Sequence, residues 1–387
     1  MNLLYVGPRY HTNQVPIMKG WIEHGDHVTF AAQFEGKSEV HDYVDFVKIK
    51  PSKMCLRKFR SIDKHYDAST AEDKKIEAFV PSFIEMIKLL QRVKPDVVVL
   101  RDRKITSFVT YMACRLLGIK KVILYTQTSY EKLSQKDGFL KEFIRNVCFP
   151  RAVFTPVMYK GNRIKTPQNI PHVYFIPLVA DVGEKKKTYC NNNQLKLLDV
   201  GKYRDYKNHF YLIDAIEPLK NRDDISITII GEVSNDAERQ YYAKLEHTIM
   251  EKGLSHMVTL RKNVSYRMMN TVYDEHDLLV LPSKNETAGM VILEAMAESL
   301  GVISSNNCGL ICYAEMNDSG KSFPLDNITE VTNLIQHVAD HNEIVVQWGT
   351  NARKAVEEKF QFKQYYTAFM GMIRDEFEDR KKESRMD

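Results

Sequence analysis

Apolar and polar residues follow one another in blocks along the chain. Short runs rich in Val and Ile carry no internal alternation, which is typical of strands buried on both faces, and segments with helical spacing separate them. In the N-terminal half the runs that predict strands are 2–7, 27–32, 95–100 and 120–126, and those that predict helices are 15–25, 81–93 and 107–118. This alternation predicts an α/β fold built on a parallel sheet.

The same alternation restarts after a polar stretch in the middle of the chain. Residues 179–194 include three lysines and three asparagines, a composition typical of a linker, and predict a domain boundary near 182–192. Beyond it the predicted strands are 195–201, 225–231, 277–283 and 301–305, with a helix at 209–220. We therefore expect two doubly wound, Rossmann-like domains, 1–183 and 184–363. An amphipathic final segment, 364–387, is expected to dock on the first domain and to become solvated from about Glu378.

Length and composition agree with this division and limit the class of protein. A chain of 387 residues exceeds one ordinary core. The formal net charge of +5 suits anionic ligands or an anionic membrane surface but is too weak to indicate nucleic-acid binding. No run of 18 apolar residues predicts a membrane span, and the start, MNLLYVGPRYH, has no basic segment before an apolar core that would predict a secretory signal. The six cysteines include no CxxC pair, which indicates reduced thiols in a cytoplasmic protein.

One strand–turn–helix–strand unit, 277–305, carries two glutamates. Its predicted helix, 290–300, is apolar nearly all round and opens at the carboxyl end of a strand, where α/β sheets bind ligands and where free amides attract phosphate. Glu286 lies in the turn and Glu294 inside the helix. A buried carboxylate without a partner costs several kcal/mol. Glu294 is therefore expected either to pair with a basic side chain or to face a polar ligand.

A basic loop follows the first strand of the same half. Gly201 permits a tight turn, and Lys202, Arg204 and Lys207 follow it just before a helix. Three cations in one loop suit a diphosphate, although a solvated basic loop has the same composition. Together with the two glutamates, the loop predicts a nucleotide-sugar site in which cations hold phosphates and carboxylates accept hydrogen bonds from hydroxyls.

At these residues the sequence resembles glycosyltransferase family 4. The stretch ETAGMVILEAMAESLGV, 286–302, is similar to the E-x7-E motif of that family, and GKYRDYKN, 201–208, is similar to its basic loop, as are LPS at 281–283 and IIGE at 229–232. The resemblance implies a retaining enzyme of the GT-B fold. Such an enzyme has two Rossmann-like doubly wound domains with an active-site cleft between them, the first binding the acceptor and the second the nucleotide-sugar donor.

The resemblance also implies roles for single residues. Glu294 would bind the ribose hydroxyls, Glu286 would touch the transferred sugar, and Lys202 and Lys207 would grip the diphosphate. Glu286, Lys202 and Lys207 are thus the catalytic candidates. The further donor-binding candidates are Gly201, Arg204, Gly231, Thr287, Ala288, Gly289, Met290 and Glu294. In the mechanism attributed to this family the leaving phosphate accepts the proton of the acceptor.

Four positions depart from the family pattern. Ser299 stands where the family commonly has Gly, and Gly301 where it has Pro. The first loop, GPRYHTNQVP at 7–16, lacks the Gly-Gly pair of many members, and Gln127 stands where many carry a His. The N-terminal half is therefore where this chain differs most from the family.

Two other segments are candidates for ligand contact. Arg101, Asp102 and Arg103 follow a predicted strand; Arg103, like Gln127, is a candidate contact to acceptor or donor, and a surface ion-pair cluster is the alternative. The basic segment 53–67, with Met54, Leu56 and Phe59 interleaved, suits anionic lipid or a solvated connection equally.

The sequence thus predicts a metal-independent hexosyltransferase that needs no cofactor. Its substrates would be a nucleotide diphosphate sugar and a glycan or lipid-linked acceptor, in surface polysaccharide or glycoconjugate synthesis. It would lie in the cytoplasm, with peripheral contact at the inner face of an anionic membrane. Two alternatives stay open. One is a GT-B nucleotide-sugar epimerase, which would use water in place of an acceptor, and the other is a non-catalytic sugar-nucleotide-binding protein.

Overall fold

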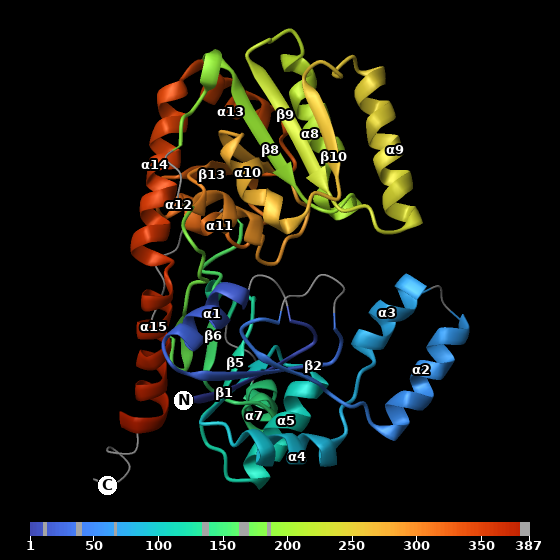
Figure 1. Ribbon diagram of the computed structural model, residues 1–387, viewed down its shortest axis with the longest axis vertical. Helices are drawn as coiled ribbons and strands as arrows, with labels where there is room; N and C mark the ends of the chain where they lie inside the picture. The colour runs from blue at the N-terminus through green and yellow to red at the C-terminus, as the bar shows by residue number, and fades with distance from the viewer. Residues whose placement is uncertain are drawn as a thin grey trace. The chain divides into compact units, whose positions relative to one another are not determined.

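The computed structural model describes residues 1–10, 14–35, 41–65, 68–133, 139–161, 170–183 and 187–379. The chain forms two compact units (Figure 1). The N-terminal unit comprises Met1–Pro156, Gln168–Val179 and the residues from Phe362 on, and the C-terminal unit comprises Val157–Pro167 and Ala180–Gln361. The chain therefore returns to its first unit after completing the second.

A seven-stranded sheet in the order β3-β2-β1-β4-β5-β6-β7 forms the centre of the N-terminal unit, and all its pairs are parallel. Its strands are β1 Asn2–Gly7, β2 His27–Ala32, β3 Asp45–Lys48, β4 Val97–Arg101, β5 Val122–Tyr125, β6 Val153–Thr155 and β7 Val173–Phe175. The strand order reverses between β1 and β4. At such a switch point the loops at the carboxyl ends of the strands diverge, which leaves room for a ligand.

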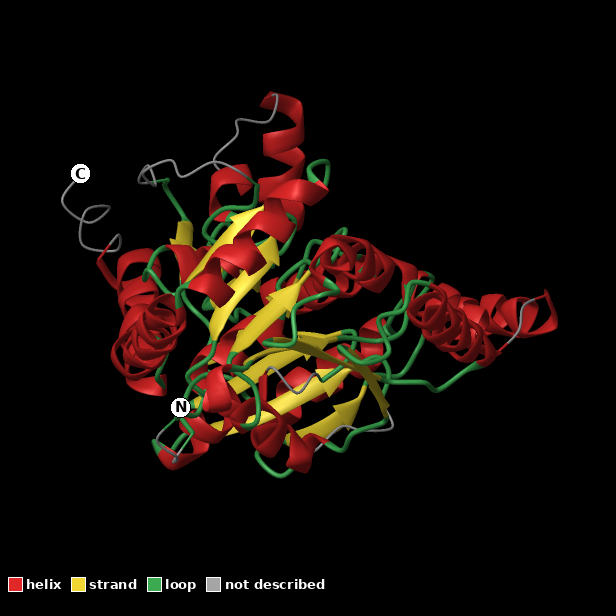
Figure 2. Ribbon diagram, turned by 90° about the horizontal axis from the view of Figure 1, so that it is seen from above, coloured by secondary structure: helices red, strands yellow, loops and turns green. Residues whose placement is uncertain are grey.

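Helices cover both faces of this sheet (Figures 1 and 2). The helices of the unit are α1 Val15–Glu23, α2 Lys53–His65, α3 Ala68–Glu77, α4 Phe83–Val93, α5 Ile105–Leu116, α6 Tyr130–Leu133, α7 Phe139–Cys148 and α15 Phe362–Arg374, which continues as a π-helical turn, Asp375–Asp379. Of these, α2 and α3 form a pair that projects beside the sheet (Figure 1). The basic segment 53–67, for which a solvated connection between strands was one interpretation, is largely helical. Most of it forms α2, which turns Cys55 and Ile62 inward, and residues 66 and 67 lie outside the described residues.

The final helix packs on the first one. The Trp21 ring meets the rings of Phe362 and Phe369 nearly edge-on, at centroid distances of 5.2 and 5.3 Å. Gly20 makes this approach possible, because a Cβ there would lie 2.1 Å from the Phe362 ring. The turn after α15 is also fixed, since Glu376 accepts hydrogen bonds from His172 and from Tyr174. Residues 380–387 of the predicted solvated tail lie outside the described part of the chain.

The C-terminal unit has a six-stranded parallel sheet in the order β10-β9-β8-β11-β12-β13. Its strands are β8 Leu195–Val200, β9 Ile225–Gly231, β10 Val258–Lys262, β11 Leu278–Leu281, β12 Gly301–Ser305 and β13 Gly320–Phe323. Its α-helices are α8 His209–Ile216, α9 Asp236–Glu251, α10 Met269–Asp274, α11 Met290–Ala297, α12 Ile311–Glu315, α13 Ile328–Asp340 and α14 Asn342–Lys359. The 3₁₀ turns are Asn191–Asn193, Asp205–Lys207, Glu217–Leu219 and Tyr266–Met268. The switch point of this sheet lies between β8 and β11.

Two predicted helices end earlier than expected. The α-helix predicted at 209–220 ends at Ile216 and continues as a 3₁₀ turn that contains a proline. The helix predicted at 290–300 ends at Ala297, because Ser299 adopts a left-handed conformation with φ of 65°. The amides of Ser299 and Leu300 donate to the carbonyls of Met296 and Ala295, which is a Schellman cap. Ser299 therefore occupies the position at which helices favour glycine.

The described part of the predicted linker packs against the C-terminal unit. The ammonium group of Lys187 donates to the carbonyls of Tyr273 and Asp274, at the end of α10, over 2.6 and 2.7 Å. The Tyr189 hydroxyl donates to the Ser299 carbonyl, and the Cys190 amide donates to Asp277. The polar composition of this stretch therefore reflects capping and anchoring bonds over residues 187–190.

Candidate functional site

Two loops meet at the carboxyl edge of the C-terminal sheet. One follows β8 and the other follows β11, so they lie on the two sides of the switch point. They are tied by hydrogen bonds from the Lys284 amide to the Tyr206 carbonyl, 2.8 Å, and from the Asn208 side chain to the Pro282 carbonyl, 3.1 Å. Residues about 80 positions apart in the sequence are therefore neighbours in the fold, because β8 lies next to β11 in the sheet.

Lys207 and Glu286 form an ion pair at this edge. The Lys207 ammonium donates to the Glu286 carboxylate over 2.5 Å, and Lys207 is only 8% exposed. Burial disfavours the charged lysine, but the neighbouring Glu286 outweighs it, so the pKa of Lys207 is raised above its usual value. Two of the three predicted catalytic residues thus touch each other, with the cation fully charged at neutral pH.

The backbone that carries Glu286 is held by the loop after β12. The Glu286 amide donates to the Asn307 carbonyl, the Gly309 amide donates to the Glu286 carbonyl and the Leu310 amide donates to the Ala288 carbonyl. Gly309 admits this contact because a Cβ there would lie 2.1 Å from the Thr287 carbonyl oxygen. The sequence analysis did not identify this support. The NNCG run at 306–309, directly after a buried strand, is the sequence feature from which this contact could have been predicted.

Helix α11 begins beside the ion pair without a side-chain cap. Its N-cap is Gly289, in a left-handed conformation with φ of 79°, so the N-cap residue offers no side chain to accept a hydrogen bond from the first amides. Such amides together with the helix dipole attract an anion. The predicted residues Thr287, Ala288, Gly289 and Met290 therefore lead into a helix N-terminus whose N-cap residue carries no side chain.

Glu294 lies one turn further along α11 and has a different partner. Its carboxylate accepts a hydrogen bond from the Tyr273 hydroxyl over 2.9 Å. Among the described residues no basic side chain lies within ion-pair distance of it, so the ion-pair interpretation of Glu294 is wrong. Burial raises the pKa of Glu294, and the bond from Tyr273 opposes that rise. The Glu294 residue as a whole is partly exposed.

The three cations of the first loop have different acidic partners in the structure. The Lys202 ammonium pairs with Glu232 at 2.8 Å, and the Arg204 guanidinium pairs with Glu238 at 2.7 Å. Burial would raise the pKa of Glu238, but the Ser234 amide and hydroxyl and the Arg204 guanidinium lower it to about 2. Each cation of the loop therefore has a carboxylate partner of its own, and Arg204 ties the loop to the start of α9.

The two predicted glycines let the ends of β8 and β9 approach closely. A Cβ on Gly231 would lie 2.3 Å from the Gly201 carbonyl oxygen, and a Cβ on Gly201 would lie 2.8 Å from the Lys207 side chain. The structure thus gives both glycines a packing role beneath the loop.

A buried polar pair lies behind Lys207 and was not identified from the sequence. Asp199 and His209 are both 0% exposed, and the nearest His209 nitrogen lies 3.8 Å from the Asp199 carboxylate. Neither carboxylate oxygen of Asp199 has a hydrogen-bond partner among the described side chains, nor has His209 Nε2. Burial raises the pKa of Asp199 to about 8 and lowers the pKa of His209 to about 3. An aspartate directly after the apolar pair Leu197 and Leu198 in a predicted buried strand was the available signal.

The N-terminal candidates lie in the other unit. Arg103 is exposed, and Gln127 donates to the Tyr125 hydroxyl over 3.3 Å. Arg101 instead turns inward, with its guanidinium 4.6 Å from the centre of the Tyr125 ring. Of the two arginines in this loop, Arg101 therefore reaches the interior.

The described residues contain neither a metal-binding cluster nor a helix that could cross a membrane. No group of three or more His, Cys, Asp or Glu side chains lies close enough together to hold a metal ion in the described ranges. No helix of the described chain combines the length and the apolar character that a membrane crossing requires.

The architecture and the site define a class of protein. Two parallel α/β sheets flanked by helices form the GT-B fold, which the structural neighbours share. A glycosyltransferase from Rickettsia africae aligns with a TM-score of 0.69 at 12% identity, over 96% of this chain and 97% of that one. The Anabaena protein Alr3699/HepE, solved in complex with UDP, aligns with a TM-score of 0.67 at 13% identity, over 97% of this chain and 100% of that one.

The sequence comparisons concern the C-terminal unit. Residues 183–355 match the model of the family described as glycosyl transferases group 1. The alpha-D-kanosaminyltransferase of Streptomyces kanamyceticus is 24% identical over 194 residues, which are 50% of this chain and 49% of the relative. The match thus spans about half the length of that relative. Over this unit the chain is similar to group 1 glycosyltransferases.

Proposed function

We propose that this protein is a retaining glycosyltransferase of family 4, which transfers a hexose-type sugar from a nucleotide diphosphate sugar to a glycan or lipid-linked acceptor. The observation that carries the proposal is the Lys207–Glu286 pair beside the uncapped N-terminus of α11. A buried cation and free helix amides suit a diphosphate, and the adjacent carboxylate suits a sugar hydroxyl. The UDP bound to the Anabaena neighbour supports a nucleotide donor.

In the transition state of this reaction the sugar ring becomes cationic and the departing phosphate becomes anionic. Lys207 and the first amides of α11 would stabilise the departing phosphate. Glu286 holds Lys207 in place before the donor enters, at an ammonium–carboxylate distance of 2.5 Å. Glu294 would accept hydrogen bonds from the ribose hydroxyls. The leaving phosphate would accept the proton of the acceptor hydroxyl, so this route needs neither a protein base nor a metal ion or other cofactor.

The test measures nucleotide release from a panel of nucleotide sugars, with and without a crude glycolipid acceptor. Release that depends on acceptor supports transfer, release without acceptor supports the epimerase or hydrolysis, and binding without release supports a binding protein. Lys207→Ala should lower kcat/KM about 10²-fold or more, whereas Lys220→Ala, at an exposed position of the same unit, is the matched control. Kinetics of Lys207→Ala equal to wild type contradict the phosphate assignment.

The Glu286→Gln variant distinguishes the role of Glu286 from that of Lys207. Because Glu286 would contact the sugar near the reacting centre, the variant should lower kcat more than it raises KM. Its affinity for UDP, which lacks the sugar, should be at least that of wild type, because Lys207 is then no longer held by a carboxylate. A loss of UDP affinity together with an unchanged kcat argues against this division of roles.

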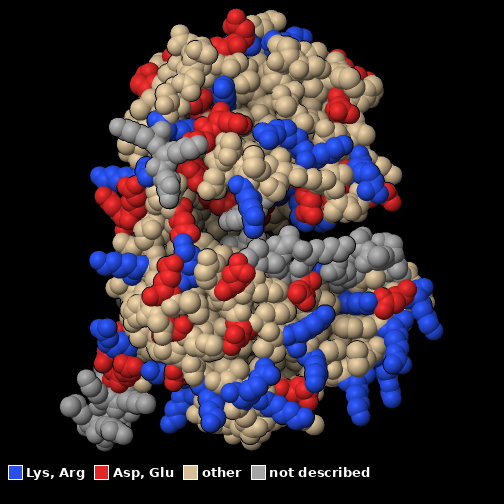
Figure 3. Space-filling model, in the orientation of Figure 1, with Lys and Arg blue, Asp and Glu red and all other residues tan. Residues whose placement is uncertain are grey.

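We also propose that the protein contacts an anionic membrane surface through α2. The exposed residues of this helix include Lys53, Arg57, Lys58, Arg60 and Lys64. Met54 is 71% exposed and Leu56 44% exposed among them. In Figure 3 Lys and Arg side chains gather at this side of the N-terminal unit. Basic residues with exposed apolar neighbours suit anionic lipid, at about 1 kcal/mol for each well-placed cation.

Flotation with phosphatidylglycerol vesicles at low salt tests the membrane proposal. Wild type should float with these vesicles, and less so with phosphatidylcholine or at high salt. Arg57→Glu with Lys58→Glu should abolish flotation, whereas the exposed control pair Lys220→Glu with Lys354→Glu should not. Equal flotation of both double variants contradicts the assignment to α2.

A further inference from the structure

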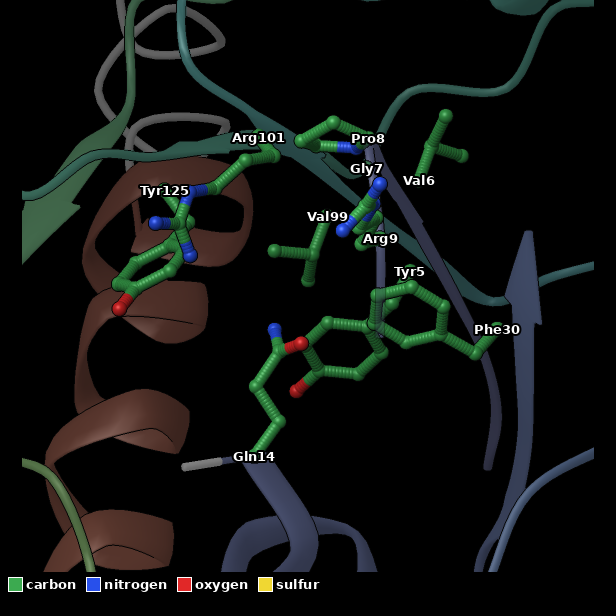
Figure 4. A pocket seen from close by; sticks show the side chains of 10 residues that line it. All are labelled: Tyr5, Val6, Gly7, Pro8, Arg9, Gln14, Phe30, Val99, Arg101 and Tyr125. Carbon is green, nitrogen blue, oxygen red and sulfur yellow. The ribbon is translucent and has the colours of Figure 1, made fainter. Parts of the chain in front are cut away.

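A hollow at the edge of the N-terminal sheet is much larger than the crevice at the switch point of that sheet. The crevice between β1 and β4 (Figure 4) has a volume of about 10 Å³, room for about one water. The hollow beside the edge strand β3 has a volume of about 260 Å³. Since roughly 10–15 Å³ holds one water, this second hollow, the β3–α4 groove, has room for a phosphate group with a substituent.

The β3–α4 groove has an apolar floor. Residues 47–50, at the end of β3 and just after it, form one wall, and the face of α4 that carries residues 85, 88, 89 and 92 forms the other. The side chains of Ile49, Met86 and Leu89 in its lining are buried, at 5%, 1% and 7% exposure. A ligand of this groove can therefore cover apolar surface as well as meet charge.

The charge of the groove is predominantly positive. Its lining holds four cations, Lys48, Lys50, Lys88 and Arg92, and one carboxylate, Glu85. Glu85 accepts hydrogen bonds from Lys88 and Lys50, each over 3.0 Å, and these bonds lower its pKa. Within the described chain neither Lys48 nor Arg92 pairs with a carboxylate. Exposed ion pairs such as those of Glu85 contribute little, so the groove as a whole attracts a further anion.

Exposed apolar side chains flank the groove. An antiparallel bridge joins Pro51, two residues before α2, to Pro81, two residues before α4, so these two helices begin side by side. At their first turns Phe83 and Ile84 of α4 are 41% and 65% exposed, and Met54 of α2 is 71% exposed. Exposed apolar side chains next to cations are typical of a surface that meets lipid. The groove therefore continues the basic, partly apolar surface of α2.

We propose that the β3–α4 groove binds the phosphate group of an anionic phospholipid, with Lys48 and Arg92 as its main contacts. The inference rests on the proposed membrane contact through α2 and names the lipid group that this contact would select. The guanidinium fork of Arg92 suits two phosphate oxygens, and Lys48 adds a compact charge. The glycerol and the first methylenes of the lipid would cover the apolar floor, which a free phosphate would leave in water.

Titration calorimetry with dihexanoyl phosphatidylglycerol, at concentrations below micelle formation, tests the groove apart from any vesicle. Wild type should bind this lipid. Glycerol 3-phosphate should bind about tenfold or more weakly, because it lacks the chains that cover the apolar floor. Lys48→Gln with Arg92→Gln should weaken binding of the lipid about tenfold or more. The matched control is Lys120→Gln with Arg151→Gln, which changes two exposed cations of the same unit.

Each result of this titration decides for or against the groove. Glycerol 3-phosphate that binds as tightly as the lipid indicates a site for a soluble phosphate ester and overturns the lipid assignment. No binding by wild type, or equal lipid affinity in the two double variants, overturns the groove as a phosphate site. Because Lys48 and Arg92 are exposed, both double variants should fold, which urea unfolding checks.

Flotation with phosphatidylglycerol vesicles separates this inference from the proposed contact through α2. If Arg57→Glu with Lys58→Glu floats like wild type while the groove variant loses affinity for the short-chain lipid, the α2 contact fails and the groove stands. If the α2 variant no longer floats and the groove variant binds the short-chain lipid like wild type, the groove fails and the α2 contact stands. Neither measurement uses a sugar donor, so both are independent of the proposed transfer reaction.

Discussion

Replacement of Glu294 by glutamine tests how the buried carboxylate of α11 is stabilised. Its one protein hydrogen bond comes from the Tyr273 hydroxyl, over 2.9 Å, and no cation pairs with it among the described residues. Glutamine keeps the shape and can accept the same bond, so the variant strands no charge. A lost or weakened neutral bond costs about 0.5–1.5 kcal/mol, whereas a stranded cation would cost about 3–5 kcal/mol.

The pH dependence of this variant has a definite sign. Because burial raises the pKa of Glu294, the folded state holds its proton more tightly than the unfolded state. Wild type therefore loses stability as the pH rises from the unfolded pKa through the folded one, and glutamine does not. Urea unfolding of Glu294→Gln at pH 7 should give a free energy within about 1 kcal/mol of wild type or above it, and the variant should lose any such advantage near pH 4.

Donor binding should change although the fold does not. Hydrogen bonds from ribose hydroxyls to a carboxylate are worth about 1.5–3 kcal/mol, so Glu294→Gln should bind UDP roughly 10- to 10²-fold more weakly by calorimetry. Tyr273→Phe is the control, because it removes the protein partner of Glu294 and leaves the carboxylate in place. A fall in stability of 3 kcal/mol or more, with UDP affinity intact, would refute the reasoning.

Three other substitutions have expected outcomes that unfolding and pH measurements can check. Ser299→Gly should stabilise the protein by up to about 1 kcal/mol in urea, because Ser299 has a φ of 65°, and Ser299→Ala, which keeps the strain, should not. Asp199→Asn should gain stability relative to wild type as the pH rises from about 4 towards 8, since the pKa of Asp199 is raised to about 8, and a constant difference across that range contradicts the assignment. Gly20→Ala should destabilise by roughly 1–3 kcal/mol, because its Cβ would lie 2.1 Å from the Phe362 ring, whereas Gly371→Ala, with no atom within 4 Å, should not.

The central strands were predictable because they are buried on both faces. The runs at 2–7, 27–32, 225–231 and 301–305 coincide with β1, β2, β9 and β12, most of whose residues are buried. Edge strands carry a weaker signal. β10 is VTLRK and β13 is GKSF, and both are partly exposed, so their sequences do not read as buried strands. Short strands near an edge depend on a neighbour that the sequence pattern does not reveal.

The site residues were predictable as types, but their partners were not. Lys207 and Glu286 are 79 positions apart and meet because β8 lies next to β11, a strand order that periodicity does not give. Lys202 and Arg204 stand in the same loop as Lys207, yet each has a carboxylate of its own from the segment after β9. The composition of a loop shows which cationic side chains it carries. The direction in which each side chain points depends on the acidic groups that neighbouring loops place within reach.

The two glutamates of the motif have different electrostatic partners. Glu286 is charged against a buried ammonium, so the pair is neutral in the absence of donor, and an entering phosphate can exchange with the carboxylate at Lys207 without leaving a cation stranded. Glu294 has only a neutral hydroxyl as its partner, so its charge stays costly until further donors reach it. A group of ribose hydroxyls would supply those donors. The proposed donor site would thus have one carboxylate that is satisfied before binding and one that binding would satisfy, and the second would make the affinity sensitive to the ribose.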